Sequence, residues 1–281
     1  MLNELTFYKK YFDCSVKDAT TYKIDFLNTI IKNGKIYKFI AFDSNKNLNK
    51  IKMNGIQNEV LWFSHYIYLN DKSEFEIKYN AKQISKYTNV SCSQIHYLIG
   101  IIKEMYDVCS FTYDYEQHMW RDYANDGEGI CICYDVKDMD MLYPVEYVEK
   151  DKINFTSLII QSIIQSHSIA LSERMKNIDP MSILPFVIKN PMNGELLSYK
   201  EKEVRILYSA YDDGSLNQGV IYPNVKAEKQ YRGSNMSYKD CGLKVNKIII
   251  GNKCSNEIER KLVEVCTEKD YLYEKINGRV H

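Results

Sequence analysis

The stretch that most constrains the fold is residues 119–135, MWRDYANDGEGICICYD, in which bulky aromatic and charged residues precede two glycines and an apolar run. We expect a short helix over residues 116–124, a turn at the two glycines, and a buried strand over residues 129–134. Trp120 and Tyr123 lie three positions apart and would share one face of that helix. Because tryptophan is usually buried, the sequence favours core packing for Trp120, with a stacking surface as the alternative.

The spacing and type of the apolar residues predict the remaining elements. Helical spacing predicts helices over residues 18–32, 91–105, 153–174, 181–188 and 256–267. Strand composition predicts strands over residues 5–12, 60–63, 108–112, 142–148, 199–208, 244–250 and 271–276. We expect residues 43–58 to form a solvated connection with room for a short turn of helix, and residues 212–242 to form a Gly- and Tyr-rich loop.

These elements follow one another in irregular order, without repeating βαβ units. The sequence therefore predicts an α+β fold with a mixed or antiparallel central sheet flanked by helices. We expect a single domain over residues 1–281, with a helical insertion at residues 151–192. Within the insertion, residues 153–188 are the predicted surface for a protein partner.

Composition excludes several classes of protein. Lys+Arg and Asp+Glu both total 37, so the net charge gives no general attraction to nucleic acid or to an anionic membrane. No apolar run reaches the ~18 residues of a membrane helix, so we expect no membrane partner. Eight scattered cysteines, without a signal peptide at the start, predict reduced thiols and a cytoplasmic location. Cys131 and Cys133 would share one strand face without a second cysteine pair, so no metal site is predicted.

The most suggestive charged pattern is Glu201-x-Glu203-x-Arg205. On a strand, alternate residues point the same way, so these three would line one face while Lys202 and the apolar residues after it line the other. Such alternation is typical of a solvated outer face with weak ion pairs. The alternative is a pair of carboxylates held beside a cation at a binding cleft.

Short blocks along the chain together resemble one bacterial family, the domain of unknown function numbered 2971. The most specific are the Trp-x-x-Tyr-Ala block at residues 120–124 and the Glu-x-Glu-x-Arg block at residues 201–205. Two positions depart from the family pattern: the Asn70-Asp71 turn lacks the proline that commonly follows it, and Asp122 stands where a histidine is frequent. The resemblance covers about residues 5–255 and implies a role in antiviral defence or toxin biology, without fixing an activity. The other matching blocks are residues 7–11, 61–64, 69–71, 109–111, 129–132 and 249–251, together with Lys189.

A second resemblance is to the ADP-ribosyltransferases, whose sites combine an early aromatic or basic residue, a middle aromatic-hydroxyl strand and a late Glu-x-Glu. Here Tyr8 or Lys9, then Phe63-Ser64, then Glu201-x-Glu203 occur in that order. The resemblance implies an enzyme that uses NAD and transfers ADP-ribose to an acceptor.

The same resemblance implies a role for each residue. Glu203 would bind the nicotinamide ribose and stabilise the positive charge that develops as nicotinamide leaves, and Glu201 would orient the acceptor. Ser64 would position the ribose, and Tyr8 or Trp120 would stack on a ring. The predicted contacts to NAD are thus Tyr8, Lys9, Ser64, Trp120, Tyr123 and Arg205. The transferase hypothesis predicts that Tyr8, Ser64, Trp120 and Glu203 converge on one site.

Two functions of other classes use some of the same residues. A recognition module without catalysis would bind a nucleotide or nucleic acid by charge and stacking, through Arg121, Lys189, Arg205 and the Trp120/Tyr123 pair. A nuclease-like effector would hold a divalent ion with oxygen ligands, through Asp71, Asp122, Glu201 and Glu203. The transferase is the leading hypothesis.

Overall fold

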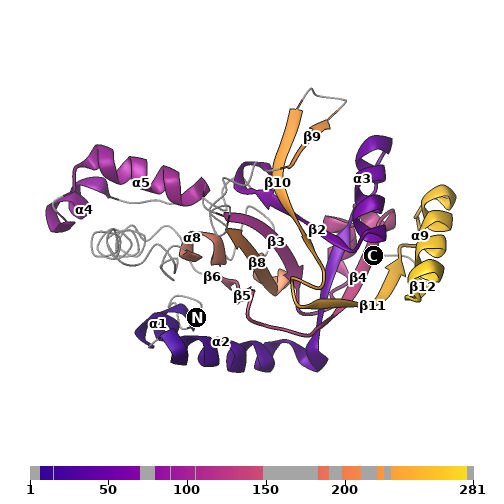
Figure 1. Cartoon of the computed structure of the whole chain (residues 1–281), viewed down its shortest axis with the longest axis horizontal. Helices are drawn as coiled ribbons and strands as arrows, with labels where there is room; N and C mark the ends of the chain where they lie inside the picture. Colours follow the sequence, from indigo (N-terminus) through magenta and orange to yellow (C-terminus); the bar gives the residue numbers. More distant parts are fainter. Residues whose placement is uncertain are drawn as a thin grey trace.

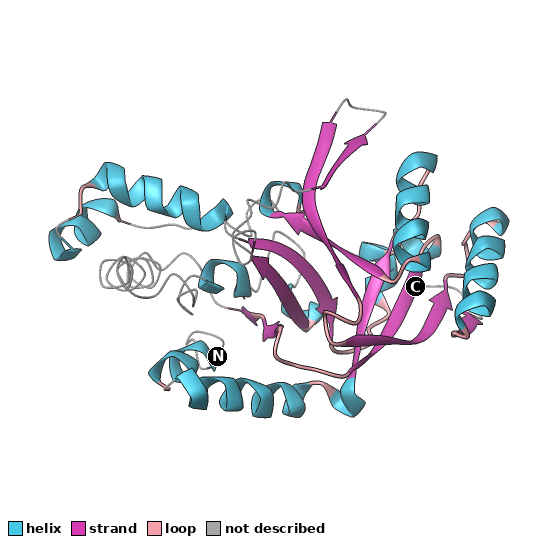
Figure 2. Cartoon of the chain, viewed as in Figure 1, coloured by secondary structure: helices cyan, strands magenta, loops and turns pink. Residues whose placement is uncertain are grey.

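The computed structural model of the protein describes residues 7–14, 16–69, 80–88, 90–104, 106–147, 183–189, 198–209, 220–224 and 229–276. Its centre is a mixed, mostly antiparallel β-sheet flanked by helices (Figures 1 and 2), which confirms the predicted α+β class.

The strands of the main sheet are β1 (Lys35–Ile40), β2 (Val60–His65), β3 (Tyr106–Thr112), β4 (Ile130–Val136), β5 (Leu142–Pro144), β8 (Glu203–Ser209), β9 (Val220–Asn224), β10 (Lys229–Ser237), β11 (Leu243–Ile250) and β12 (Leu272–Lys275). Their order is β12-β11-β4-β1-β3-β2-β10-β9, with β8 paired to β3 and β5 paired to β8. All these pairs are antiparallel except β11 with β12. Two short strands, β6 (Glu146–Tyr147) and β7 (Ile188–Lys189), form a separate parallel pair.

Strand β3 is the branch point of the sheet. Along one edge it pairs with β8 over its whole length, from Tyr106 opposite Ser209 to Thr112 opposite Glu203. The other edge is shared, because β1 pairs with its carboxyl end and β2 pairs nearer its amino end. The branch brings β8 beside the middle of the sheet.

The helices are α1 (Phe7–Asp13), α2 (Val16–Ile30), α3 (Lys46–Gln57), α4 (Ala81–Thr88), α5 (Cys92–Glu104), α6 (His118–Tyr123), α8 (Leu184–Val187) and α9 (Asn256–Lys269). Single 3₁₀ turns occur at η1 (Lys32–Gly34), η2 (Tyr66–Tyr68), η3 (Asn125–Gly127) and η5 (Ser198–Glu201). The predicted helices at α2, α5, α6 and α9 are confirmed. Ser91 caps helix α5, since its side-chain oxygen accepts from the N–H of Gln94 while Gln94 Oε1 accepts from the N–H of Ser91.

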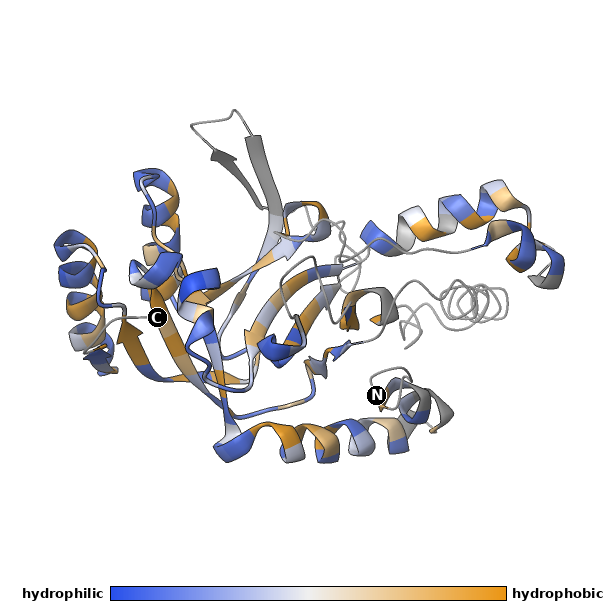
Figure 3. Cartoon of the chain, turned by 180° about the vertical axis from the view of Figure 1, so that it is seen from behind, coloured by the Kyte–Doolittle hydropathy of each residue, from blue (hydrophilic) through white to orange (hydrophobic). Residues whose placement is uncertain are grey.

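The main core lies on one face of the sheet, under α3, α9 and the carboxyl end of α2. Strand alternation explains it, since Ile130 and Ile132 of β4 and Val204 and Ile206 of β8 all point to this side. Figure 3 shows apolar residues concentrated on the central strands, while α3 and α9 carry both apolar and polar residues, as amphipathic covering helices do.

The opposite face of the sheet, called here the second face, carries two smaller apolar clusters. One joins α1, α8 and part of α2 to Tyr106, Val108 and Leu207 of β3 and β8. The other packs Trp120 of α6 against β1, β4 and β11. Glu203 and Arg205 project from β8 on this second face, where α8 and the strand pair β6–β7 cover them.

Three segments form elements of another type than the sequence predicts. Residues 5–12 do not form a strand in their described part, because Phe7, Tyr8 and Tyr11 fall on one side of helix α1 and pack in its cluster. Residues 43–58 contain the 12-residue helix α3 rather than a short turn, since Asn45 caps its first turn and Met53 and Ile56 reach the main core. Residues 212–242 contain the antiparallel hairpin β9–β10, which projects from the sheet in Figure 1.

Other predicted boundaries differ in smaller ways. The strand expected over residues 199–208 begins only at Glu203, after the 3₁₀ turn η5. The strand expected over residues 142–148 divides into β5 and β6. The helix expected over residues 181–188 is the single turn α8, followed by strand β7.

Most of the predicted insertion, residues 151–182 and 190–192, lies outside the described residues. Residues 183–189 are described and lie against the second face, where Phe186, Val187 and Ile188 join the cluster around α1. Across the described part of the chain, no helix has the length and apolar character needed to cross a membrane.

Candidate functional site

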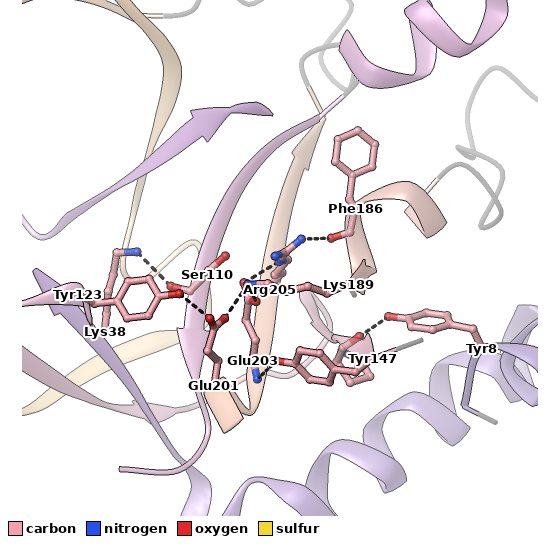
Figure 4. A network of polar contacts seen from close by, with 11 residues as sticks. Tyr8, Lys38, Ser110, Tyr123, Tyr147, Phe186, Lys189, Glu201, Glu203 and Arg205 are labelled. Carbon is pink, nitrogen blue, oxygen red and sulfur yellow. Dashed lines mark hydrogen bonds and ion pairs between the residues drawn. The ribbon is translucent and has the colours of Figure 1, made fainter. Parts of the chain in front are cut away.

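A buried network of charged and hydroxyl groups lies on the second face (Figure 4). Glu203 and Arg205 share this face by strand alternation, and the register places Arg205 opposite Ser110 of β3. Arg205 Nε donates to Glu203 Oε1 at 2.7 Å, and Arg205 Nη1 donates to the carbonyl oxygen of Phe186 at 2.5 Å. The side chains of Arg205 and Glu203 are only 1% and 7% exposed, so the expected solvated outer face is wrong. Helix α8 and the strand pair β6–β7 cover it.

Lys189, at the end of β7, joins the two glutamates. Its Nζ atom donates to Glu201 Oε2 at 2.6 Å and to Glu203 Oε2 at 3.2 Å. The Lys189 side chain is 7% exposed, so this ammonium group is desolvated almost completely. A buried charge of this kind is stable only when it is paired, and the two carboxylates provide the pairing.

Two tyrosine hydroxyls complete the network from either side. Tyr123, at the end of α6, donates to Glu201 Oε1 at 2.8 Å. Tyr147 of β6 accepts the backbone N–H of Glu203 at 3.2 Å. The carboxylates are thus fixed both through their side chains and through the backbone of β8.

The environment shifts the pKa of several of these groups. Burial raises the pKa of the Glu203 carboxyl, and the charge of Lys189 acts against this rise. Burial lowers the pKa of Lys189, but Glu203 and Glu201 together raise it by more, so the net shift is upward and the amine is charged at neutral pH. Burial, then the negative charge of Glu201, raises the pKa of Tyr123, which is therefore a neutral hydrogen-bond donor.

Lys202, between the two glutamates, departs from strand alternation. Its φ angle is 47°, in the left-handed region, and its Nζ atom pairs with Asp114 Oδ2 at 2.6 Å and Glu116 Oε1 at 2.9 Å. The prediction that Lys202 lines the apolar side with Val204 is therefore wrong. A lysine facing the main core there would be a buried charge without a partner, and the left-handed turn avoids it.

The structure links Tyr123, Glu201, Glu203 and Arg205 from the residues predicted to form the site. Tyr8 is buried nearby, where its hydroxyl donates to the carbonyl oxygen of Pro144 at 2.6 Å. The Lys9 side chain lies outside the described residues.

Trp120 and Ser64 lie on the second face but outside this network. Trp120 is 1% exposed, so its predicted core position is confirmed. Its indole N–H donates to the Tyr115 hydroxyl at 2.8 Å, and its ring meets Phe39 edge to face. Ser64 lies opposite Val108, two strand spacings and four residues from Glu203, which separates the two Cα atoms by roughly 16 Å.

The residues predicted for the recognition module and for the nuclease-like effector do not gather at one site in the described part of the chain. Lys189 and Arg205 face carboxylates inside the network, and exposed Arg121 pairs with its neighbour Asp122 at 2.7 Å. Asp71 lies outside the described residues. Among the residues that are described, no group of three or more His, Cys, Asp and Glu side chains could hold a metal ion.

Sequence reasoning missed the role of Tyr147 and the bridging role of Lys189. The family resemblance marked Lys189 as a matching position but gave it no partner. Only the parallel pairing of β7 with β6 brings Lys189 beside Tyr147. No local sequence motif predicts that contact.

No protein-family model matches the chain, and searches of the curated proteins and of the solved structures find no match either. The resemblances to the family of unknown function and to the ADP-ribosyltransferases stay predictions. Function is therefore inferred from the residues of the network.

Proposed function

We propose that the protein is an ADP-ribosyltransferase-like enzyme that uses NAD and places the Glu201/Glu203 pair at its catalytic centre. The observation that carries this proposal is the pairing of two glutamates through one buried lysine ammonium, 2.6 Å from Glu201 and 3.2 Å from Glu203. Carboxylates held so firmly need no reorganisation when positive charge develops beside them, and such preorganisation is a main source of catalytic power.

The reaction would use this negative charge at one step. The bond between ribose C1′ and the nicotinamide nitrogen breaks, and both bonding electrons leave with the nitrogen, so the pyridinium becomes neutral nicotinamide. Positive charge then spreads over C1′ and the ring oxygen of the ribose, where a carboxylate stabilises it. A nucleophilic atom of the acceptor forms the new bond to C1′ and releases its proton.

The contacts favour Glu201 as the glutamate that meets the ribose. Both oxygens of each glutamate accept a hydrogen bond, but the partners differ in charge. Glu203 contacts two cations, Arg205 and Lys189. Glu201 contacts one cation, Lys189, and the neutral hydroxyl of Tyr123, so its negative charge is less fully balanced. The Glu201 side chain is 15% exposed, about twice the 7% of Glu203. Glu203 is then the positioning residue that holds Lys189, which reverses the roles implied by the resemblance.

The same network would not supply the cations for the pyrophosphate of NAD. Arg205 and Lys189 each lie within 3.2 Å of a carboxylate oxygen, so their charges are already balanced. The residues fit the ribose end of NAD, where hydroxyl groups donate hydrogen bonds and positive charge develops.

The test is nicotinamide release and label transfer from NAD by the wild type, Glu201→Gln and Glu203→Gln, with a broad set of acceptors. Glu201→Gln keeps the size and removes the charge, so we expect turnover to fall by ~10² with little change in NAD binding. Glu268→Gln, an exposed change on α9, is the matched control and should leave turnover unchanged.

Three results would count against the proposal. Equal turnover by the wild type and Glu201→Gln would show that the Glu201 carboxylate does not stabilise the charge on the ribose. Mg²⁺-dependent cleavage of nucleic acid that Glu203→Gln abolishes, without NAD turnover, would favour the nuclease. Tight nucleotide binding without any turnover would favour the recognition module.

A further inference from the structure

Lys202 adopts a backbone conformation that is rare for a residue with a side chain. Its φ angle is 47°, and it lies between the 3₁₀ turn η5, which ends at Glu201, and strand β8, which begins at Glu203. In this left-handed region the Cβ atom crowds the following carbonyl oxygen, which only glycine avoids. Strain of this kind persists where the surrounding structure holds it, and it is frequent at functional sites.

Contacts to one neighbouring segment hold this conformation. The carbonyl oxygen of Lys202 accepts the N–H of Tyr113 at 2.9 Å, and the Lys202 Nζ atom pairs with Asp114 and Glu116. These residues belong to the connection between β3 and α6. The side chains of these ion pairs are 35–44% exposed, so each pair alone contributes little. Together with the hydrogen bond from Tyr113, they hold a conformation that a residue with a Cβ atom disfavours.

The turn at Lys202 changes the course of the chain just before β8. Glu201 therefore leaves the line of the strand and reaches α6, where Tyr123 donates to its Oε1 atom. Its Oε2 atom stays within 2.6 Å of Lys189, which also contacts Glu203. The backbone of Lys202 thus connects the two glutamates and sets the direction in which each side chain leaves the chain.

We propose that Lys202 is a positioning residue, whose left-handed backbone conformation sets the place of the Glu201 carboxylate relative to Lys189 and Glu203. Its catalytic consequence rests on the proposed function, whereas its structural consequence stands on the geometry of the turn.

Crystal structures of the wild type, Lys202→Gly and Lys202→Val test the structural consequence. Glycine adopts a positive φ angle without strain, so Lys202→Gly should keep the 2.6 Å contact between Lys189 Nζ and Glu201 Oε2. Valine disfavours that region, so Lys202→Val should lose this contact while Lys189 still pairs with Glu203. A valine variant that keeps both contacts would overturn the inference, as would a glycine variant that loses the Glu201 contact.

Kinetics test the catalytic consequence with the same variants. We expect Lys202→Val to lower kcat for NAD about tenfold with KM changed less than about threefold, and Lys202→Gly to restore kcat to within about threefold of the wild type. Equal kcat in the wild type and the valine variant would overturn the positioning role. Should the wild type not turn over NAD at all, the proposed function fails, and the crystal structures still decide the role of Lys202.

A third variant covers the case in which Lys202→Val does not fold. Lys202→Ala removes the ammonium group, as glycine does, but keeps a Cβ atom without branching. We expect its kcat to fall below that of Lys202→Gly by about threefold to tenfold. Equal kcat in the alanine and glycine variants would overturn the inference, because the two differ chiefly in their tolerance of a positive φ angle.

Discussion

The Tyr123 hydroxyl donates a 2.8 Å hydrogen bond to Oε1 of Glu201, across 78 residues of sequence. This contact joins two distant blocks of sequence, the end of α6 and the segment that runs from η5 into β8. The buried hydroxyl and the carboxylate satisfy one another, and Lys189 holds the second oxygen of Glu201. The position of the Glu201 carboxylate therefore depends on how α6 packs against the second face.

Tyr123→Phe removes this hydroxyl and keeps the ring. Because a hydrogen bond to a charged group contributes about 1.5–3 kcal/mol, we expect the free energy of unfolding in urea to fall by about 1.5 kcal/mol. Under the proposed function, turnover of NAD should fall about tenfold as Glu201 gains freedom. Tyr97→Phe, at a position 71% exposed on α5, is the control and should stay within about 0.5 kcal/mol. Equal stability of both variants would mean that the Tyr123 hydroxyl contributes nothing.

Arg205→Met tests the buried ion pair with Glu203. Methionine fills similar space but leaves one Glu203 oxygen without its cation, and breaking a buried pair from one side typically costs about 3–5 kcal/mol. We expect a loss of this size in chemical denaturation. Arg260→Met changes the same residue type where the side chain is 73% exposed, and should alter stability by less than about 0.5 kcal/mol. A loss below about 1 kcal/mol for Arg205→Met would show that the pair is not buried in solution.

The sequence predicted the parts of the fold that local patterns determine. Strand β4 at Ile130–Val136 was recognisable as an apolar run after two glycines, and helix α9 at Asn256–Lys269 by the helical spacing of its apolar residues. Helix α1 was mistaken for a strand because its aromatic residues favour strands, and only contacts such as Phe7 with Tyr22 and Phe26 reveal the helical face.

The candidate site was predictable only in part, for a similar reason. The grouping of Glu201, Glu203 and Arg205 followed from their spacing. Their burial did not, because it depends on α8 and on the strand pair β6–β7, which only the tertiary structure brings against β8. Lys189 lies 14 residues from Glu203 in the sequence, and Tyr147 lies 56 residues from it. No local pattern could therefore pair either residue with Glu203. The left-handed turn at Lys202 was not predictable, because the sequence has no glycine at that position.

Two glycines should respond in opposite ways to the same substitution. A Cβ atom on Gly129 would lie 2.2 Å from the carbonyl oxygen of Ile40, so Gly129→Ala should destabilise the protein by at least about 2 kcal/mol. Gly100, within helix α5, has nothing within 4 Å of such an atom, so Gly100→Ala should stabilise by about 0.5–1 kcal/mol. Urea denaturation of both variants measures the difference. Destabilisation by Gly100→Ala would mean that the exposed face of α5 is covered in solution.

Lys23 of α2 predicts a dependence of stability on pH. Its Nζ atom donates to the carbonyl oxygen of Asp140 and lies 4.1 Å above the ring of Tyr143. Burial lowers the pKa of Lys23 from 10.5 to about 8, and the charges of Asp140 and Asp138 offset this only in part. Below pH 8 the amine is charged in both the folded and the unfolded chain, so the folded protein bears the full cost of desolvation.

That cost should disappear as the pH rises from about 8 to about 10.5, the interval between the two pKa values of Lys23. In this range the unfolded chain keeps the proton and the folded protein releases it, so the contribution of Lys23 to the free energy of unfolding rises with pH, by about 3 kcal/mol in all. Lys23→Met carries no proton and lacks this rise. We expect urea denaturation between pH 7 and pH 10 to show the stability of the wild type increasing relative to Lys23→Met. Parallel curves would mean that the Lys23 amine keeps an ordinary pKa in the folded protein.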